Sequence, residues 1–564
     1  MFCVQVLNHK KYEALAAKQY WDLEEITPRR GDILTSDGAV LAGTKANYLM
    51  YGEPKQISDK FKVPRDLALA LAEVRASEKI SQDEVFNQLY TRFSELLNRD
   101  LMWIGLDKNV TPFEKEKIEK LGISGIGFEE EPVRYYPEGA MACHVLGFVA
   151  SDESGEKRGY YGIEGKLNED LKGKPGRVVQ ELDATGAPIL AGGYTRIDPV
   201  QGRNVVLTLD RNIQYIVERK IKEGVEKYDA VSGSVIVMDP VSGGIYAMAN
   251  YPVYKPDDFL SEEGVEEKSP HRKKIEKRNM AISTTYEPGS VMKPLTISGA
   301  IDLALVRPGT TFEDNGPVWY SGYLVDNWDG KHYGTQTIVQ LLQKSNNIGA
   351  AWVGHQLGAK NLHKYFGDFG IGEISGIDLE GEDSGILRNP GELSDVGIAN
   401  ISFGQGVSAT PLQVLNAFNA IANGGYLVRP KIIEKVVDGT KEIPIPVKVI
   451  RKVITKETSS TMIDLLEKAA VGGEAKFYVL KTYRIAGKTG TGQIPVGGKY
   501  DLQKTNATFA GFMSGSNKFS MIVRLEEPRT SVYAAETAVP LWMDVASELI
   551  KIFGLPPDRA QVSI

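Results

Sequence analysis

The pattern of apolar and polar residues divides the chain into two parts of different character. Residues 27–195 contain short alternating runs such as GDILTSDGAVLAG (31–43), and two stretches, 65–77 and 83–100, in which apolar residues recur every three or four positions. Alternation predicts half-buried strands, whereas the longer spacing predicts amphipathic helices. Asp37-Gly38 between apolar runs predicts a hairpin turn. We therefore expect an irregular α+β module here.

The pattern changes after GRNVVLTLDRNIQYIVERKIKEGVEKY (202–228), and longer apolar runs begin at Ser232. SGSVIVMDPVSGGIYAMANYP (232–252) predicts two strands joined by a turn, and RIAGKTGTGQ (484–493), NATFAGFMSG (506–515) and FSMIVRLEEP (519–528) predict three more. A final helix is expected at 538–554, because Gly554 ends an amphipathic run. Strands at both ends of a mainly helical region predict one antiparallel sheet, assembled from distant segments, with a helical insert.

Composition narrows the function classes. A chain of 564 residues is too long for one hydrophobic core, so at least two domains are expected. A net charge of −7 argues against general nucleic-acid binding, and the two cysteines, Cys3 and Cys143, exclude a disulfide framework. Cys143 beside His144 is a candidate metal pair, but the surrounding MACHVLGFVA favours a packed apolar segment. We expect no metal and no cofactor.

The beginning of the sequence allows two interpretations. MFCVQVL is apolar, and a polar, helix-like run, NHKKYEALAAKQYWDLEE (8–25), follows it. Seven apolar residues cannot cross a bilayer, which requires about 17 to 25, and the features of a signal peptide are missing. The segment is either a frayed terminus or the end of a membrane helix that starts before this sequence. The charged run 262–278 predicts a solvated surface loop.

The stretch YEPGSVMKPLT (286–296) contains a Ser-x-x-Lys pair. Such pairs are weak signals, since about two are expected by chance in a chain of this length, and Ser154 with Lys157 forms a second one in a charged loop. A Pro-Gly turn precedes Ser290, and a proline follows Lys293 directly, where it is tolerated only in a first helical turn. A helix should therefore begin close to Ser290, with Lys293 on the same face.

These two residues could form a nucleophile and its base. A serine hydroxyl needs a base, and none of the six histidines lies beside the motif, so a Ser-His-Asp triad has little support. Lysine can replace histidine if burial and a neighbouring cation lower its pKa from about 10.4. The apolar residues after Lys293 favour its burial, although a solvent-facing, ordinary lysine is the alternative.

A second polar motif is Ser345-Asn346-Asn347 in LLQKSNNIGAAW. It could simply be a polar kink or cap between two helices. Functionally, the Ser345 hydroxyl could relay a proton to a leaving group, and the Asn347 amide could hold a substrate amide. The sequence leaves both interpretations open.

The third motif is Lys488-Thr489-Gly490 in RIAGKTGTGQ, followed by Thr491. A lysine and two threonines on one strand offer a cation and hydroxyl donors for a carboxylate, and the glycines let a substrate backbone lie close. The motif is not a P-loop, because the glycine four residues before the Gly-Lys pair is missing.

The three motifs in this order are the signature of penicillin-binding proteins and serine β-lactamases. The chain resembles a class B penicillin-binding protein, and YEPGS and SFGQG resemble the division-type, septal subgroup. The resemblance spans nearly the whole chain, including Arg30–Ala42, Arg134–Gly139, Tyr160–Gly176 and Ser402–Gly425. It implies an α+β fold with the end of a membrane anchor and a juxtamembrane helix (1–26), an elongated pedestal of the dimerisation type (27–195) and a penicillin-binding transpeptidase domain (196–564).

The resemblance also implies the role of each motif in a peptidoglycan D,D-transpeptidase. Ser290 would attack the penultimate D-Ala of a stem peptide and release the last D-Ala, with Lys293 as base, although the proton acceptor is disputed for such enzymes. Ser345 and Lys488 would transfer a proton to the leaving amine, and Asn347 would bind a substrate amide and orient the base. Thr489, Gly490 and Thr491 would bind the terminal carboxylate. The backbone N–H groups of Ser290 and Thr491 would form the oxyanion hole.

The resemblance further implies partners, location and rivals. The expected ligands are stem peptides on nascent glycan strands, with β-lactams as covalent inhibitors, and the expected protein partners are a SEDS-type glycan polymerase and division proteins. The protein should be anchored in the cell membrane with its catalytic domain outside, and apolar codons should precede the first residue given. The alternatives are a D,D-carboxypeptidase or β-lactam hydrolase on the same scaffold, and a non-catalytic scaffold.

Overall fold

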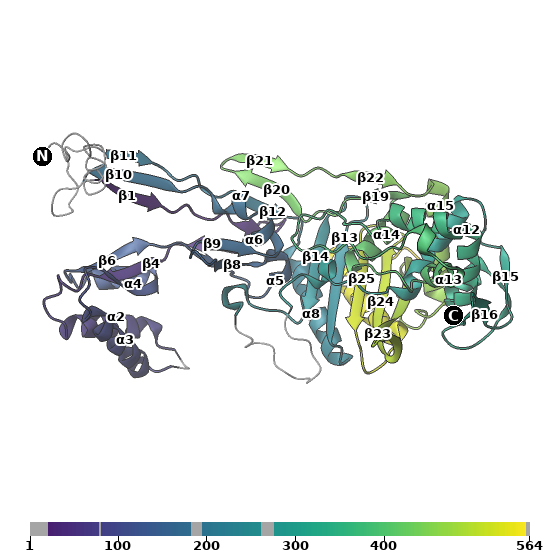
Figure 1. The fold of residues 1–564 in the computed structure, drawn as a ribbon, viewed down its shortest axis with the longest axis horizontal. Coiled ribbons are helices and arrows are strands. Elements are labelled where there is room, and N and C mark those ends of the chain that lie inside the picture. Colours follow the sequence, from purple (N-terminus) through teal and green to yellow (C-terminus); the bar gives the residue numbers. More distant parts are fainter. Residues whose placement is uncertain (1–20, 78–79, 182–193, 261–275, 560–564) are drawn as a thin grey trace, which may run out of the picture. The chain divides into compact units, whose positions relative to one another are not determined.

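The computed structural model describes residues 21–77, 80–181, 194–260 and 276–559, which form two compact units (Figure 1). The first unit comprises the described parts of 1–32, 42–135 and 169–203, and the second comprises those of 33–41, 136–168 and 204–564. The predicted boundary at residue 195 stays a prediction. Most of the expected 262–278 loop and the expected end of a membrane anchor lie outside the described residues.

The first unit contains two small sheets and a helical layer. One sheet has the order β1-β10-β11, with β1 at Trp21–Ile26, β10 at Gly176–Glu181 and β11 at Tyr194–Ile197. The other has the order β5-β4-β6, with β4 at Tyr48–Gly52, β5 at Ile104–Val110 and β6 at Ile126–Glu130. Its core includes Met50, Leu67, Leu71, Phe93 and Leu106, from this second sheet and from the two helices α2 (Lys62–Arg75) and α3 (Gln82–Leu97). Both predicted helices are confirmed.

One local prediction in this region is wrong and another is confirmed. Residues 8–20 of the predicted helix-like run lie outside the described residues, but 21–25 belong to strand β1, whose six residues pair antiparallel with β10. Pairing with a distant segment overrides the local pattern there. The Asp37-Gly38 turn joins β2 (Ile33–Leu34) to β3 (Val40–Lys45). Gly38 has φ +86° and its N–H donates to the Thr35 carbonyl, a geometry that glycine adopts without strain.

The second unit is built on the expected antiparallel sheet. Its strand order is β14-β13-β25-β24-β23, with β13 at Ser232–Met238, β14 at Ile245–Tyr251, β23 at Ile485–Val496, β24 at Lys499–Met513 and β25 at Ser520–Glu526. All seven residues of β25 are buried, which shows that both faces of the sheet are covered. Strands from the two ends of the region thus meet in one sheet, as the sequence predicts.

Helices cover this sheet and form the insert. α8 (Arg211–Lys227) and the predicted last helix, α16 (Ala538–Ile552), share a core with β13, β24 and β25 that includes Val217, Val235, Phe509, Val523 and Trp542. α14 (Pro411–Ala422) packs against β24 and β25. The insert contains α10 (Lys293–Asp302), α11 (Ile338–Lys344), α12 (Asn347–Asp368), α13 (Asp395–Ser402) and α15 (Lys456–Gly472). In the described part of the chain, no helix combines the length and hydropathy needed to span a bilayer.

Candidate active site

The first motif lies in a tight turn at the start of the insert. Ser290 belongs to the 3₁₀ turn η3 (Gly289–Met292), and α10 begins at Lys293 with Pro294 in its first turn, where no backbone N–H is needed. The predicted helix start is therefore confirmed to within one turn. Ser290 is partly exposed, whereas Lys293 is fully buried. The arrangement leaves the hydroxyl accessible and removes the amine from water.

Lys293 lies among acceptors that suit a neutral amine. Its Nζ is 2.8 Å from Asn347 Oδ1, is hydrogen-bonded to the Ser345 carbonyl, and lies 3.0 Å from Ser290 Oγ. The two carbonyl oxygens can only accept, so they take the two hydrogens of a neutral amine. In the structure Nζ donates to Ser290 Oγ; a neutral amine keeps its two bonds to the carbonyl oxygens and has its lone pair free to accept the Ser290 proton.

Burial also favours the neutral form. Loss of hydration lowers the pKa of Lys293 well below its usual range, the nearby Lys488 cation lowers it further, and the Glu474 carboxylate opposes both effects. With none of its surface exposed, Lys293 does not face solvent, so the ordinary-lysine interpretation is wrong. The side chain is placed as a base would have to be.

The second motif lies between two helices of the insert. Ser345 ends α11 in a left-handed conformation with φ +54°, and Asn346 caps α12 by accepting from the Gly349 N–H at 2.7 Å. Ser345 Oγ lies 3.3 Å from Lys293 Nζ. The capping interpretation therefore holds for the middle residue, and its two neighbours point toward the buried amine.

The third motif lies on β23, an edge strand of the five-stranded sheet. Lys488 is buried, and its Nζ donates to Ser345 Oγ at 3.0 Å and to Thr489 Oγ1 at 2.9 Å. A Cβ on Gly490 would lie 2.5 Å from the carbonyl oxygen of Pro288, so only glycine lets β23 run this close to the nucleophile turn. The strand prediction is confirmed.

The motifs meet in one place. Contacts of 3.0 to 3.3 Å connect Ser290 to Lys293, Lys293 to Ser345, and Ser345 to Lys488. Burial lowers the pKa of Lys488 also, while Glu474 raises it. Thr491 is partly exposed, and its Oγ1 accepts from the Ala534 N–H at 3.2 Å. The roles of these residues, and the oxyanion hole at Ser290 and Thr491, stay predictions.

Comparison with known families gives this arrangement a context. The family model of the penicillin-binding protein transpeptidase domain matches residues 233–545, and that of the penicillin-binding protein dimerisation domain matches residues 25–207. The chain belongs to the penicillin-binding proteins. The expected family is therefore confirmed.

Individual relatives match this protein in sequence or structure over nearly its whole length. Stage V sporulation protein D of Bacillus subtilis is 30% identical, over 99% of this chain and 84% of the relative. Peptidoglycan D,D-transpeptidase FtsI of Escherichia coli K12 is 28% identical, over 95% of this chain and 86% of the relative. The crystal structure of a peptidoglycan synthetase from Bifidobacterium adolescentis superposes with a TM-score of 0.74 at 25% identity, covering 96% of this chain and 98% of that one. The predicted α+β transpeptidase fold with its N-terminal dimerisation-type domain is confirmed.

Sequence reasoning missed a carboxylate in this penicillin-binding protein. Glu474 follows the end of α15, accepts a hydrogen bond from the Thr489 hydroxyl, and lies 3.7 Å from Lys488 Nζ. It stands in GGEAKF, a stretch with no motif or periodicity. Only the fold brings this carboxylate to the edge strand.

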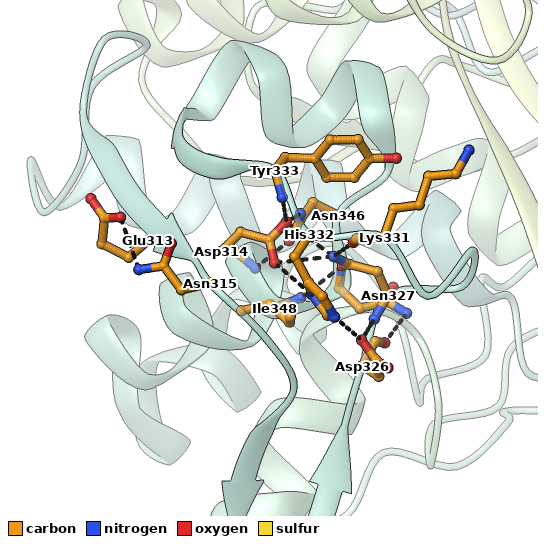
Figure 2. Close-up of polar contacts among 12 residues, drawn as sticks. Glu313, Asp314, Asn315, Asp326, Asn327, Lys331, His332, Tyr333, Asn346 and Ile348 are labelled. Atoms are coloured by element: carbon orange, nitrogen blue, oxygen red, sulfur yellow. Dashed lines mark hydrogen bonds and ion pairs between the residues drawn. The ribbon is translucent and has the colours of Figure 1, made fainter.

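A buried polar network that positions the second motif was also missed (Figure 2). Asp314, at the end of β15 (Thr311–Asp314), is fully buried and accepts from Asn346 at 2.6 Å and from Asn327 at 3.0 and 3.2 Å. The Asn327 side chain in turn accepts from the Asn347 N–H at 3.0 Å. Asp314 thus holds Asn346 directly, and it holds Asn347 through the side chain of Asn327.

We expect Asn327→Ala to destabilise the protein by about 1 to 3 kcal/mol, because it leaves a buried carboxylate and the Asn347 N–H with lost partners. Denaturant unfolding measures the change. Asn315→Ala is the matched control, since Asn315 is exposed and donates only at 3.3 Å to Glu313. Equal unfolding midpoints for the two variants would show that the network carries no stability.

The candidate metal pair lies away from this site. Cys143 and His144 are both buried, and His144 Nε2 lies 2.9 Å from the backbone oxygen of Glu276. Burial raises the pKa of the Cys143 thiol and lowers the pKa of His144 to about 4. The packed-segment interpretation is confirmed. No metal-type group of three His, Cys, Asp or Glu side chains occurs within the described ranges.

Proposed function

We propose that this protein is a peptidoglycan D,D-transpeptidase that cross-links stem peptides through an acyl-enzyme on Ser290. The observation that carries the proposal is the buried Lys293 amine, 3.0 Å from the Ser290 hydroxyl, with a lowered pKa. A hydroxyl paired with a neutral amine can form a covalent acyl intermediate at neutral pH. The curated relative named for this activity supports the choice of reaction.

In the acylation step, Lys293 takes the Ser290 proton as Oγ attacks the carbonyl of the penultimate D-Ala. The C–N bond to the last D-Ala then breaks, and the departing nitrogen receives a proton. Ser345 can deliver that proton, because its Oγ lies within 3.3 Å of Lys293 Nζ and 3.0 Å of Lys488 Nζ. An amine from a neighbouring stem peptide then takes the acyl group and frees Ser290.

Binding of the donor strand would use the open edge of β23. Gly490 lets the strand lie against the turn that carries Ser290, and Thr489 and Thr491 offer hydroxyl groups for the terminal carboxylate. Asn347 would hold a substrate amide as well as Lys293. Backbone N–H groups of Ser290 and Thr491 would stabilise the oxyanion, by about 3 to 4 kcal/mol per donor.

Penicillin is expected to form a long-lived adduct on Ser290, because no residue of the three motifs is assigned to remove the acyl group with water. Digestion of the labelled protein and mass spectrometry of its peptides locate the adduct, and a chase with unlabelled drug measures its lifetime. Rapid turnover of the drug would instead favour the rival hydrolase or D,D-carboxypeptidase. An adduct elsewhere in the chain would contradict the proposed nucleophile.

We further propose a membrane-anchored, extracytoplasmic protein of septal wall synthesis. The division-type sequences YEPGS and SFGQG and the match over most of FtsI support this. A SEDS-type glycan polymerase and division proteins are the proposed partners. A fluorescent fusion distributed evenly around dividing cells, without enrichment at the septum, would contradict the septal role.

A further inference from the structure

A carboxylate of the protein occupies the donors that the proposed function assigns to the ligand. The Thr489 hydroxyl donates to Glu474 Oε2, and Lys488 Nζ lies 3.7 Å from the same oxygen. Lys488 also donates to Thr489 Oγ1 at 2.9 Å, so the contacts form a continuous chain from Lys488 through Thr489 to Glu474. This series of contacts ends at the Glu474 carboxylate, beside the edge strand β23.

The hydrogen-bonding capacity of Thr489 is limiting. A threonine hydroxyl has one hydrogen, so Thr489 can donate either to Glu474 or to the carboxylate of a ligand, but not to both. The second donor, Lys488, is buried with only 3% of its side chain exposed and can balance one nearby carboxylate more readily than two. A ligand carboxylate must therefore displace Glu474 or accept a like charge beside it.

Glu474 lies at the solvent-facing side of these contacts. About 24% of its side chain is exposed, and it lies on the segment after α15, outside the strand. Two carboxylates close together repel each other, most strongly where water is excluded. The buried Lys488 shows that the inner side of this site is dry.

We propose that Glu474 is a specificity-determining residue, which competes with the carboxylate of an anionic ligand for Thr489 and Lys488. The proposal rests on the proposed function of the Ser290 site. Glu474 lowers the reactivity of the protein toward acyl donors that carry a carboxylate, relative to neutral donors of the same shape. An acyl donor without a carboxylate leaves the Glu474 contacts in place, so Glu474 does not slow its reaction with Ser290.

The test compares two ligands, benzylpenicillin and its methyl ester, which differ in the carboxylate. We expect Glu474→Gln to raise the ratio of their acylation rate constants, anion over ester, by about tenfold. Glutamine keeps an acceptor for Thr489 but removes the charge. A general effect on Ser290 or Lys293 changes both rates together and cancels in the ratio, so the ratio reports the carboxylate alone.

Glu457→Gln is the matched control, because it removes one charge from the exposed first turn of α15, the helix that precedes Glu474, and it should leave the ratio unchanged. Glu474→Ala, checked for folding by its thermal melt, should raise the ratio also. An unchanged ratio in folded Glu474 variants that still react with penicillin would overturn the inference. If the wild-type protein reacts with neither ligand, the proposed function fails, and this inference fails with it.

Discussion

Ser290→Ala is expected to abolish covalent labelling by penicillin and cross-linking of stem peptides, with a loss of more than about 10³-fold. The Ser290 hydroxyl contacts the Lys293 amine, and the other motif hydroxyl beside that amine, on Ser345, is buried. Because Ser290 is partly exposed and alanine is smaller, the fold should tolerate the change. Labelling with fluorescent penicillin, read on a denaturing gel, measures the effect.

The chain supplies its own control for this experiment. Ser154 and Lys157 repeat the Ser-x-x-Lys spacing at exposed positions, a turn and the first residue of β9 (Lys157–Tyr160), and the Ser154 hydroxyl donates to Asp152 at 2.6 Å. Ser154→Ala should label like the wild-type protein. If Ser290→Ala labelled at a normal rate while its thermal melt was unchanged, another residue would be the nucleophile.

Lys293→Ala is expected to slow acylation by about 10² to 10⁴-fold, the range for loss of a general base. Lys293→Met should be as slow, because methionine fills a similar volume without a basic atom. Comparison of the two variants therefore distinguishes the effect of losing the amine from the effect of losing the buried volume of the side chain. Stopped-flow or quenched labelling with penicillin gives the acylation rate constant for each variant.

The lysine experiment has a control variant and a check on folding. Lys157→Ala, in the exposed Ser-x-x-Lys repeat, should leave the rate unchanged. Lys293→Met keeps most of the buried volume, so this variant should remain folded, which circular dichroism checks. Near-normal acylation in folded Lys293→Met would assign the base to another group, of which Lys488 is the nearest candidate through Ser345.

The sequence predicts the parts of this site that depend on local patterns. The proline after Lys293 predicted a helix start near Ser290, and the run RIAGKTGTGQ predicted a strand around Lys488; both were found. Apolar periodicity predicted the sheet and its last helix for the same reason, since each strand or helix repeats its pattern several times. The convergence of Ser345 with both lysines followed only from the resemblance.

The parts that escaped prediction depend on single contacts between distant segments. Glu474 lies in an irregular stretch, and Asp314 is 32 residues before Asn346, so no period marks either of them. Strand β1 was mistaken for helix because its paired residues in β10 lie 150 to 160 positions further along the chain. Such contacts are formed by tertiary packing, which overrides local propensity.

The pH dependence of acylation tests most directly whether Lys293 is the neutral base. Below the pKa of Lys293 the amine carries a proton and cannot accept another, so the rate should fall in proportion to the neutral fraction. Because burial and Lys488 hold this pKa well below the usual range, we expect the rate to rise and level off well before the pH at which an ordinary lysine titrates. A rate that keeps increasing up to about pH 10.4 would contradict the account, since it would show an amine that is charged in the resting protein.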